Sequence, residues 1–307
     1  MWTVDCRLWT ALIPDTMPRW FAYALTTTIL WGVWGALVEI PEKGGFPATL
    51  GYSVWALTMV PCSLFALRIN NWKFEYDPKS IMHGMLIGLL GAGGTVILFQ
   101  ALRDGPAYLI FPIISLSPVV TIILSIIFLK EKASRKSWIG ICLALIAIPF
   151  LTYQPGENIG HGYLWLILSL LVFLMWGVQA FIMKVANHFM KAESIFFYMM
   201  FSAILLIPFA VSATDFSQSV NWGFKGPYLT AMIQILNAVG ALILVNAFRY
   251  GKAIIVSPLI NAGAPVITII ISLFIYSVIP HPLIITGMLM ALISVYLMGL
   301  EDSPVES

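Results

Sequence analysis

The chain has 307 residues, of which 60% are hydrophobic and only 10% charged, and its mean hydropathy is +0.93. An ordinary soluble domain is about a quarter charged, so this composition excludes a typical water-soluble protein and predicts an integral membrane protein. The formal net charge is +2, and without a basic cluster interleaved with aromatic residues nothing supports nucleic-acid binding.

Residues 1–17, before the first long apolar stretch, are expected to form a short cytoplasmic lead-in. Asp5 and Asp15 flank a short apolar run, and no small-residue cleavage site follows it. Both features argue against a signal peptide. The sequence leaves open whether Met1 or Met17 is the true start.

Ten later stretches are apolar over roughly 20 residues, the length that a bilayer-spanning helix needs. In chain order they are 20–38, 48–68, 81–101, 107–129, 136–153, 163–183, 193–213, 227–247, 253–278 and 282–300. The segments between them carry Pro, Gly, Asn and most of the charge, and none is long enough for a soluble domain. The predicted fold class is an all-α polytopic membrane protein with ten transmembrane helices in a lipid bilayer.

The distribution of Lys and Arg predicts the orientation of these helices, because cytoplasmic loops are enriched in both residues. With the N-terminus inside, only Lys43, Arg103 and Lys225 lie outside. The other 13 of the 16 basic residues lie inside: Arg7, Arg19, Arg68, Lys73, Lys79, Lys130, Lys132, Arg135, Lys136, Lys184, Lys191, Arg249 and Lys252. Both termini are therefore expected in the cytoplasm and the protein in the cytoplasmic (inner) membrane.

The sequence contains an internal repeat. The stretch "ALRDGPAYLIFP" at 101–112 returns as "AFRYGKAIIVSP" at 247–258, and "WGVWGALVE" at 31–39 returns as "WGVQAFIMK" at 176–184. The matched positions include Arg103 with Arg249, Pro112 with Pro258, Pro118 with Pro265 and Thr121 with Thr268. Ordered matches in several separated segments indicate a duplication.

Each half of the duplication holds five predicted spans. Because five is odd, the second half enters the membrane from the opposite side, which makes two inverted five-helix repeats. We place the first repeat at 18–154, the second at 155–301 and a short tail at 302–307. Inverted repeats recur in secondary transporters, where the site lies near the midplane and one repeat rocks against the other. The alternative is a duplicated membrane scaffold without transport.

These residues resemble the drug/metabolite transporter superfamily, specifically its EamA-type members. The resemblance spans about 18–300 and rests on three stretches: "ILWGVWGALVE", "ALRDGPAYLIFPIISLSPVVTIILSIIFLKEK" and "GICLALIAI". It implies two five-helix domains and export of small metabolites. The family pattern has an amide and a basic residue where Trp34 and Glu39 stand, whereas the second half keeps both as Gln179 and Lys184. The "LKEK" exit has no counterpart in the second half, where "IYSVIPHP" stands.

Two amides inside the eighth span are the first candidate substrate ligands. Gln234 and Asn237 are three residues apart and share a helix face. Their repeat mates are Gly88 and Gly91, so one half carries amides where the other carries bare backbone. The amides either line a central cavity or bond neighbouring helices together.

Asn261 and Ser115 are matched by the repeat, and each lies between the two prolines of its span. Proline removes a backbone donor and leaves a carbonyl free one turn earlier. A polar side chain in such a segment is a candidate for lining a cavity. A kink needed only for packing is the alternative.

Three tryptophans lie well inside their spans, although tryptophan usually anchors at the membrane interface. Trp31, Trp34 and Trp176 are therefore candidates for stacking on a substrate, or else they fill space between helices. Gln179, one turn from Trp176, is expected to face the same cavity.

Glu39, at the end of the first span, is the acid that we would test for a role in proton coupling. Coupling by a buried acid is weakly supported, because none of the 14 acidic residues lies in the middle of a predicted span. The sequence therefore does not identify the coupling ion. It also leaves the oligomeric state open, with a homodimer as one alternative.

The leading function is a secondary transporter of a small organic metabolite, neutral, zwitterionic or drug-like, working by alternating access and exporting its substrate. A sugar importer of the same superfamily and a non-transporting structural membrane protein are the alternatives. An enzyme is not expected, because the four histidines show no metal-ligand spacing and no Gly-x-Ser-x-Gly elbow occurs. No metal or cofactor is expected.

Overall fold

The computed structural model describes residues 17–105, 107–153, 163–276 and 280–301, and its regular structure there is entirely helical. The first half contains α2 (Arg19–Leu37), α3 (Glu39–Lys43), α4 (Ala48–Ile69), α5 (Pro78–Asp104), α6 (Ala107–Ser115), α7 (Pro118–Leu124), η1 (Ser125–Leu129) and α8 (Arg135–Leu151). The second contains α9 (Leu164–Ala186), α10 (Ala192–Leu205), α11 (Ile207–Ser212), η2 (Phe224–Tyr228), α12 (Leu229–Tyr250), α13 (Ala253–Tyr276) and α14 (Pro282–Gly299). The expected lead-in, apart from Met17, and the expected tail lie outside the described residues.

Each of the ten predicted stretches is helical over most of its described residues, which confirms the all-α class. Within the described residues, eight segments are long and apolar enough to cross a membrane. The remaining two are α8, which has 17 residues, and the stretch 107–129, which is divided among α6, α7 and η1. A count of ten transmembrane helices therefore stays a prediction.

The fourth stretch is divided at its second proline. Proline has no N–H to donate and its ring clashes with the carbonyl four residues back, so it favours the first turn of a helix over the interior. α6 ends at Ser115, and Pro118 begins α7. The matched prolines of the ninth stretch, Pro258 and Pro265, lie instead inside the continuous helix α13.

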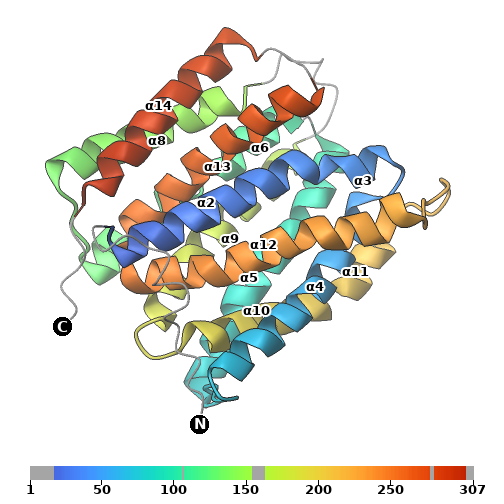
Figure 1. Cartoon of the computed structure of the whole chain (residues 1–307), viewed down its shortest axis with the longest axis horizontal. Helices are drawn as coiled ribbons and strands as arrows, with labels where there is room; N and C mark the ends of the chain where they lie inside the picture. Colours follow the sequence, from blue (N-terminus) through green and yellow to red (C-terminus); the bar gives the residue numbers. More distant parts are fainter. Residues whose placement is uncertain (1–16, 106, 154–162, 277–279, 302–307) are drawn as a thin grey trace.

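The two sequence halves are interleaved in space. α2, from the first half, packs against α12 and α13, and α9, from the second, packs against α5, α6 and α7. In Figure 1, α8 and α14 lie side by side at one edge, and α4 lies beside α10 and α11 at the opposite edge. A rigid motion of one sequence half against the other would break all of these contacts, so the expected rocking of whole repeats does not fit this packing.

Candidate functional site: two matched helix crossings

Two helix crossings bring the halves together, and each depends on a glycine of the repeated Trp-Gly pair. A Cβ added to Gly32 on α2 would lie 2.5 Å from Cβ of Ile267 on α13. A Cβ added to Gly177 on α9 would lie 2.4 Å from Cβ of Val120 on α7. Real side chains do not approach so closely, so only glycine permits either crossing.

Each crossing is held by a threonine that the repeat matches. The Thr268 hydroxyl donates to the carbonyl oxygen of Gly32 at 2.9 Å, and the Thr121 hydroxyl donates to the carbonyl oxygen of Gly177 at 3.0 Å. The sequence comparison pairs these threonines but gives no reason to place them in the site. Their role becomes clear only from the glycine carbonyl that each hydroxyl meets on the crossing helix.

The tryptophans of the two Trp-Gly pairs also make equivalent bonds. The Trp31 indole N–H donates to the backbone carbonyl of Asn237 on α12 at 3.4 Å, and the Trp176 N–H donates to the carbonyl of Gly91 on α5 at 3.3 Å. Asn237 and Gly91 are repeat mates. Each indole lies directly against a glycine of the crossing helix, Gly240 or Gly94, which the repeat also matches. Contacts between helices therefore account for a tryptophan at these two positions inside the predicted spans.

The next turn of each crossing differs between the halves. The Trp34 N–H donates to the side-chain oxygen of Gln234 at 2.9 Å, and Gln234 is buried. In the other crossing Gln179 lies against Gly91, where an added Cβ would meet its amide nitrogen at 2.3 Å. Gln234 thus bonds two helices in this conformation, which is the structural role that the sequence left open for it.

Asn237 and Asn261 have side-chain polar atoms without a hydrogen-bond partner in the described part of the chain. Both side chains are half-buried. The Asn261 amide nitrogen donates to the Ser257 carbonyl of its own helix at 2.9 Å. Within the described part of the chain, the Asn237 side-chain amide makes no hydrogen bond. Ser115, the repeat mate of Asn261, is half-buried at the end of α6.

The matched span ends, Glu39 and Lys184, lie in opposite environments. The Glu39 carboxylate is exposed and pairs with Lys43 at 2.6 Å, which does not favour the coupling role. Lys184 is buried and donates to the carbonyl oxygens of Phe248 and Gly251 at 2.9 and 2.7 Å. A basic residue at a span end commonly reaches toward the membrane surface, whereas Lys184 satisfies carbonyls at the end of α12.

The site therefore consists of indoles, amides and hydroxyls where helices of the two halves cross. Within the described residues, no three His, Cys, Asp or Glu side chains are grouped so that they could hold a metal ion. Such a set of groups can donate and accept hydrogen bonds and stack on a flat or apolar ligand, but it carries no formal charge.

Comparison with known proteins identifies the family. The model of the EamA-like transporter family matches the chain twice, over residues 18–153 and 163–300. The chain belongs to this family. It is therefore a membrane-embedded transporter-family protein, and the resemblance noted in the sequence is confirmed.

Individual relatives of this EamA-like protein are distant. An uncharacterized protein of Methanocaldococcus jannaschii is 32% identical over 94 residues, which is 31% of this chain and 68% of that one. Protein LicB of Haemophilus influenzae is 24% identical over 66% of this chain and 71% of its own. An Archaeoglobus fulgidus protein named as an uncharacterized transporter is 24% identical over 47% of this chain and 50% of its own.

A solved crystal structure shows that the fold is shared beyond recognisable sequence similarity. It superposes with a TM-score of 0.76 at 14% identity and covers 92% of this chain and 96% of the other. At that identity the likeness concerns the fold alone.

Proposed function

We propose that this EamA-like protein is a secondary transporter that exports a small neutral or zwitterionic organic solute by alternating access. The observation that supports this most is the pair of matched crossings, in which Trp31 and Trp176 make the same bond to repeat-matched carbonyls. In an inverted-repeat transporter, the two repeats exchange nearly equivalent conformations when the site changes from facing one side of the membrane to facing the other.

The moving units are the crossings themselves rather than the sequence halves. One unit contains α2 with α12 and α13, and the other contains α9 with α5, α6 and α7. Each unit draws helices from both repeats. A change of angle at one crossing, with the opposite change at the other, converts one conformation into its pseudo-symmetric counterpart.

The substrate class follows from the groups of the candidate site. The eight proposed ligands are Trp31, Trp34, Ser115, Trp176, Gln179, Gln234, Asn237 and Asn261, and none of them is ionisable at neutral pH. An isolated charge of the substrate would lack a partner among them, and burying an unpaired charge is costly. A neutral solute or one with internally balanced charge fits best.

Solute flux in proteoliposomes tests the proposal. Purified protein is reconstituted and a panel of labelled amino acids, sugars and amphiphilic amines is offered on either side. Saturable flux of one class supports transport and identifies the substrate. Uptake confined to sugars would favour the importer, whereas no saturable flux with any class would leave a structural membrane protein as the better account.

Asn237→Ala should then separate binding from packing. The Asn237 side chain has no partner in the described protein, so its loss should lower flux about tenfold while membrane abundance stays normal. Asn246→Ala is the matched control, because Asn246 lies on the same helix and bonds its own backbone, donating to Leu242 at 3.2 Å. Equal effects of the two substitutions would contradict a ligand role for Asn237.

A further inference from the structure

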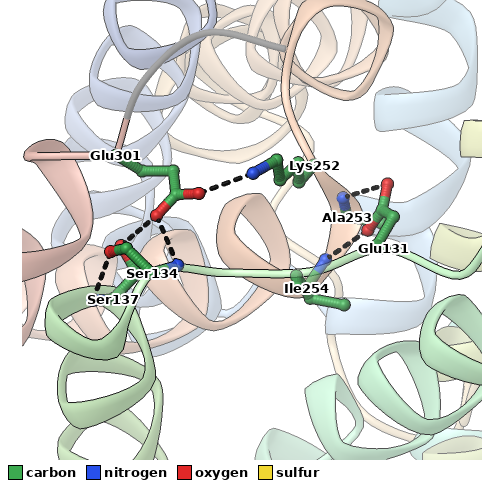
Figure 2. A network of polar contacts seen from close by, with 7 residues as sticks. All are labelled: Glu131, Ser134, Ser137, Lys252, Ala253, Ile254 and Glu301. Carbon is green, nitrogen blue, oxygen red and sulfur yellow. Dashed lines mark hydrogen bonds and ion pairs between the residues drawn. The ribbon is translucent and has the colours of Figure 1, made fainter.

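The turn between α12 and α13, residues 250–253, is bonded to a carboxylate from a distant part of the chain, in the first repeat. Glu131, which follows η1, accepts hydrogen bonds from the backbone N–H groups of Ala253 and Ile254, each at 3.1 Å (Figure 2). Both residues are fully buried. The first N–H groups of a helix have no partner within it, and a carboxylate also complements the positive end of the helix dipole. Glu131 therefore fixes the start of α13.

An ion pair ties the same turn to the end of α14. The Lys252 ammonium contacts the Glu301 carboxylate at 2.5 Å. The other carboxylate oxygen of Glu301 accepts from the Ser134 backbone N–H at 3.0 Å and from the Ser137 hydroxyl at 2.6 Å (Figure 2). The Glu301 side chain is only 7% exposed, so this carboxylate depends on the protein for its partners.

Lys184 completes the arrangement from α9 by donating to the carbonyls of Phe248 and Gly251. We call Glu131, Lys184, Lys252 and Glu301 the clamp. Three of its side chains reach the turn from separate parts of the fold and the fourth belongs to the turn. Charged hydrogen bonds out of water are the stronger kind, so the turn cannot move without breaking several of them together.

The repeat-matched turn that follows α5 lacks this arrangement among the described residues. The repeat mate of Lys184 is Glu39, which pairs with exposed Lys43, and the stretch that corresponds to "LKEK" is "IYSVIPHP", without an acid. Asp104 accepts a hydrogen bond from Gln100 of its own helix at 2.8 Å. Gly105 lies against the indole of Trp165, where an added Cβ would meet the ring at 2.2 Å.

We infer that the clamp is the latch that holds the protein closed at the 250–253 turn, and that transport requires its release. The inference rests on the proposed alternating access. Two turns related by the repeat must exchange roles during the cycle, but among the described residues only the 250–253 turn is bonded to charged side chains from other parts of the fold. From the distribution of Lys and Arg, the latched end is expected to face the cytoplasm.

Thiol labelling tests the latch without knowledge of the substrate. Cys6, Cys62 and Cys142 are replaced by serine and Ser257→Cys is added as a reporter, because Ser257 is 5% exposed and lies one turn into α13. A membrane-impermeant maleimide is applied to each side of oriented vesicles. Glu301→Gln and Glu131→Gln should each raise the labelling rate from the latched side about tenfold, the factor for one charged hydrogen bond.

Two controls keep the result decisive. Asp104→Asn removes the carboxylate of the matching turn and should leave the rate unchanged. A second reporter, Ala210→Cys, lies fully buried on α11. Unchanged labelling of Ser257→Cys in both clamp variants would overturn the latch, and so would faster labelling of both reporters, which indicates general loosening. Flux is measured separately on the unsubstituted protein, so its absence counts against transport and not against the latch.

Discussion

At the scale of single residues, glycines set how closely the helices of the two halves approach. At Gly177 an added Cβ would also lie 2.6 Å from the backbone carbonyl oxygen of Ser117. Backbone cannot rotate away as a side chain can, so the contact leaves no room for even one methyl group. Small residues at helix interfaces in membranes commonly permit such approach.

Gly177→Ala is therefore expected to lower the free energy of unfolding by about 1–3 kcal/mol, the usual cost of overpacking. Gly51→Ala is the matched control, because the nearest atom to an added Cβ there is Cγ2 of Thr230 at an ordinary 3.9 Å. That substitution should be neutral or stabilising, since alanine favours the helix over glycine. Thermal unfolding in detergent measures both, and equal losses would contradict the crossing as described.

A second residue-scale prediction concerns the bond between Trp34 and Gln234. Trp34→Phe leaves a buried amide oxygen without its donor and should cost about 1 kcal/mol. Gln234→Leu removes the orphaned group, so the double variant should be more stable than the sum of the two single losses predicts. Strict additivity in denaturant unfolding would show that the bond contributes nothing.

At the scale of elements, matched prolines give different helices in the two repeats, and their spacing is six residues in the first repeat and seven in the second. Pro118 begins α7 after a break, whereas Pro265 lies inside continuous α13. The start of α13 also has a partner for which the sequence of the second repeat provides no equivalent. Glu131 binds the start of α13 from another part of the chain, and the second repeat offers no acid at the corresponding position. Elements that the repeat matches therefore differ both in the spacing of their prolines and in their tertiary contacts.

The clamp also predicts how stability depends on pH. Burial alone would raise the pKa of Glu301, but hydrogen bonds from Lys252, Ser137 and Ser134 outweigh it and lower the pKa from its ordinary 4.5 to about 2. When folding lowers the pKa of a carboxyl group, the ionised group stabilises the folded state at pH values above its pKa in the unfolded chain. This stabilisation is lost as the pH falls from about 4.5 toward 2.

The unfolding temperature should thus be insensitive to Glu301 between pH 7 and pH 5 and should fall below that range. Glu301→Gln removes the titrating group, so the variant should start lower at pH 7 and lose less between pH 5 and pH 2.5. Parallel curves for the variant and the unsubstituted protein would contradict the assignment.

At the scale of the whole molecule, the repeat predicts opposite orientations of its two halves. Arg103 and Arg249 occupy matched positions, and both are exposed. In a cysteine-free background, Arg103→Cys should react with an impermeant maleimide from outside and Arg249→Cys from the cytoplasm. Labelling of both from the same side would contradict an inverted repeat. Reversed sides would keep the inversion and overturn the orientation drawn from Lys and Arg.

The candidate site could be predicted only in part. Trp31, Trp34, Trp176 and Gln179 are recognisable from their depth in apolar sequence, and the structure places them at the crossings. The roles of Gln234 and Lys184 could not be read, because a partner 50 or more residues away decides whether a buried polar group is satisfied. The repeat matches Thr121 with Thr268, but the sequence does not predict that each would bond a glycine carbonyl on a crossing helix.

The sequence by itself determined the membrane location, the helical class and the duplication. These depend on hydropathy, span length and the order of residues along the chain, which are local or one-dimensional properties. The tertiary structure decided that the halves interleave, that glycines and threonines form the crossings, and that one turn is clamped by charge while its repeat mate is not. Such facts depend on which distant atoms come within bonding distance, and packing sets those distances.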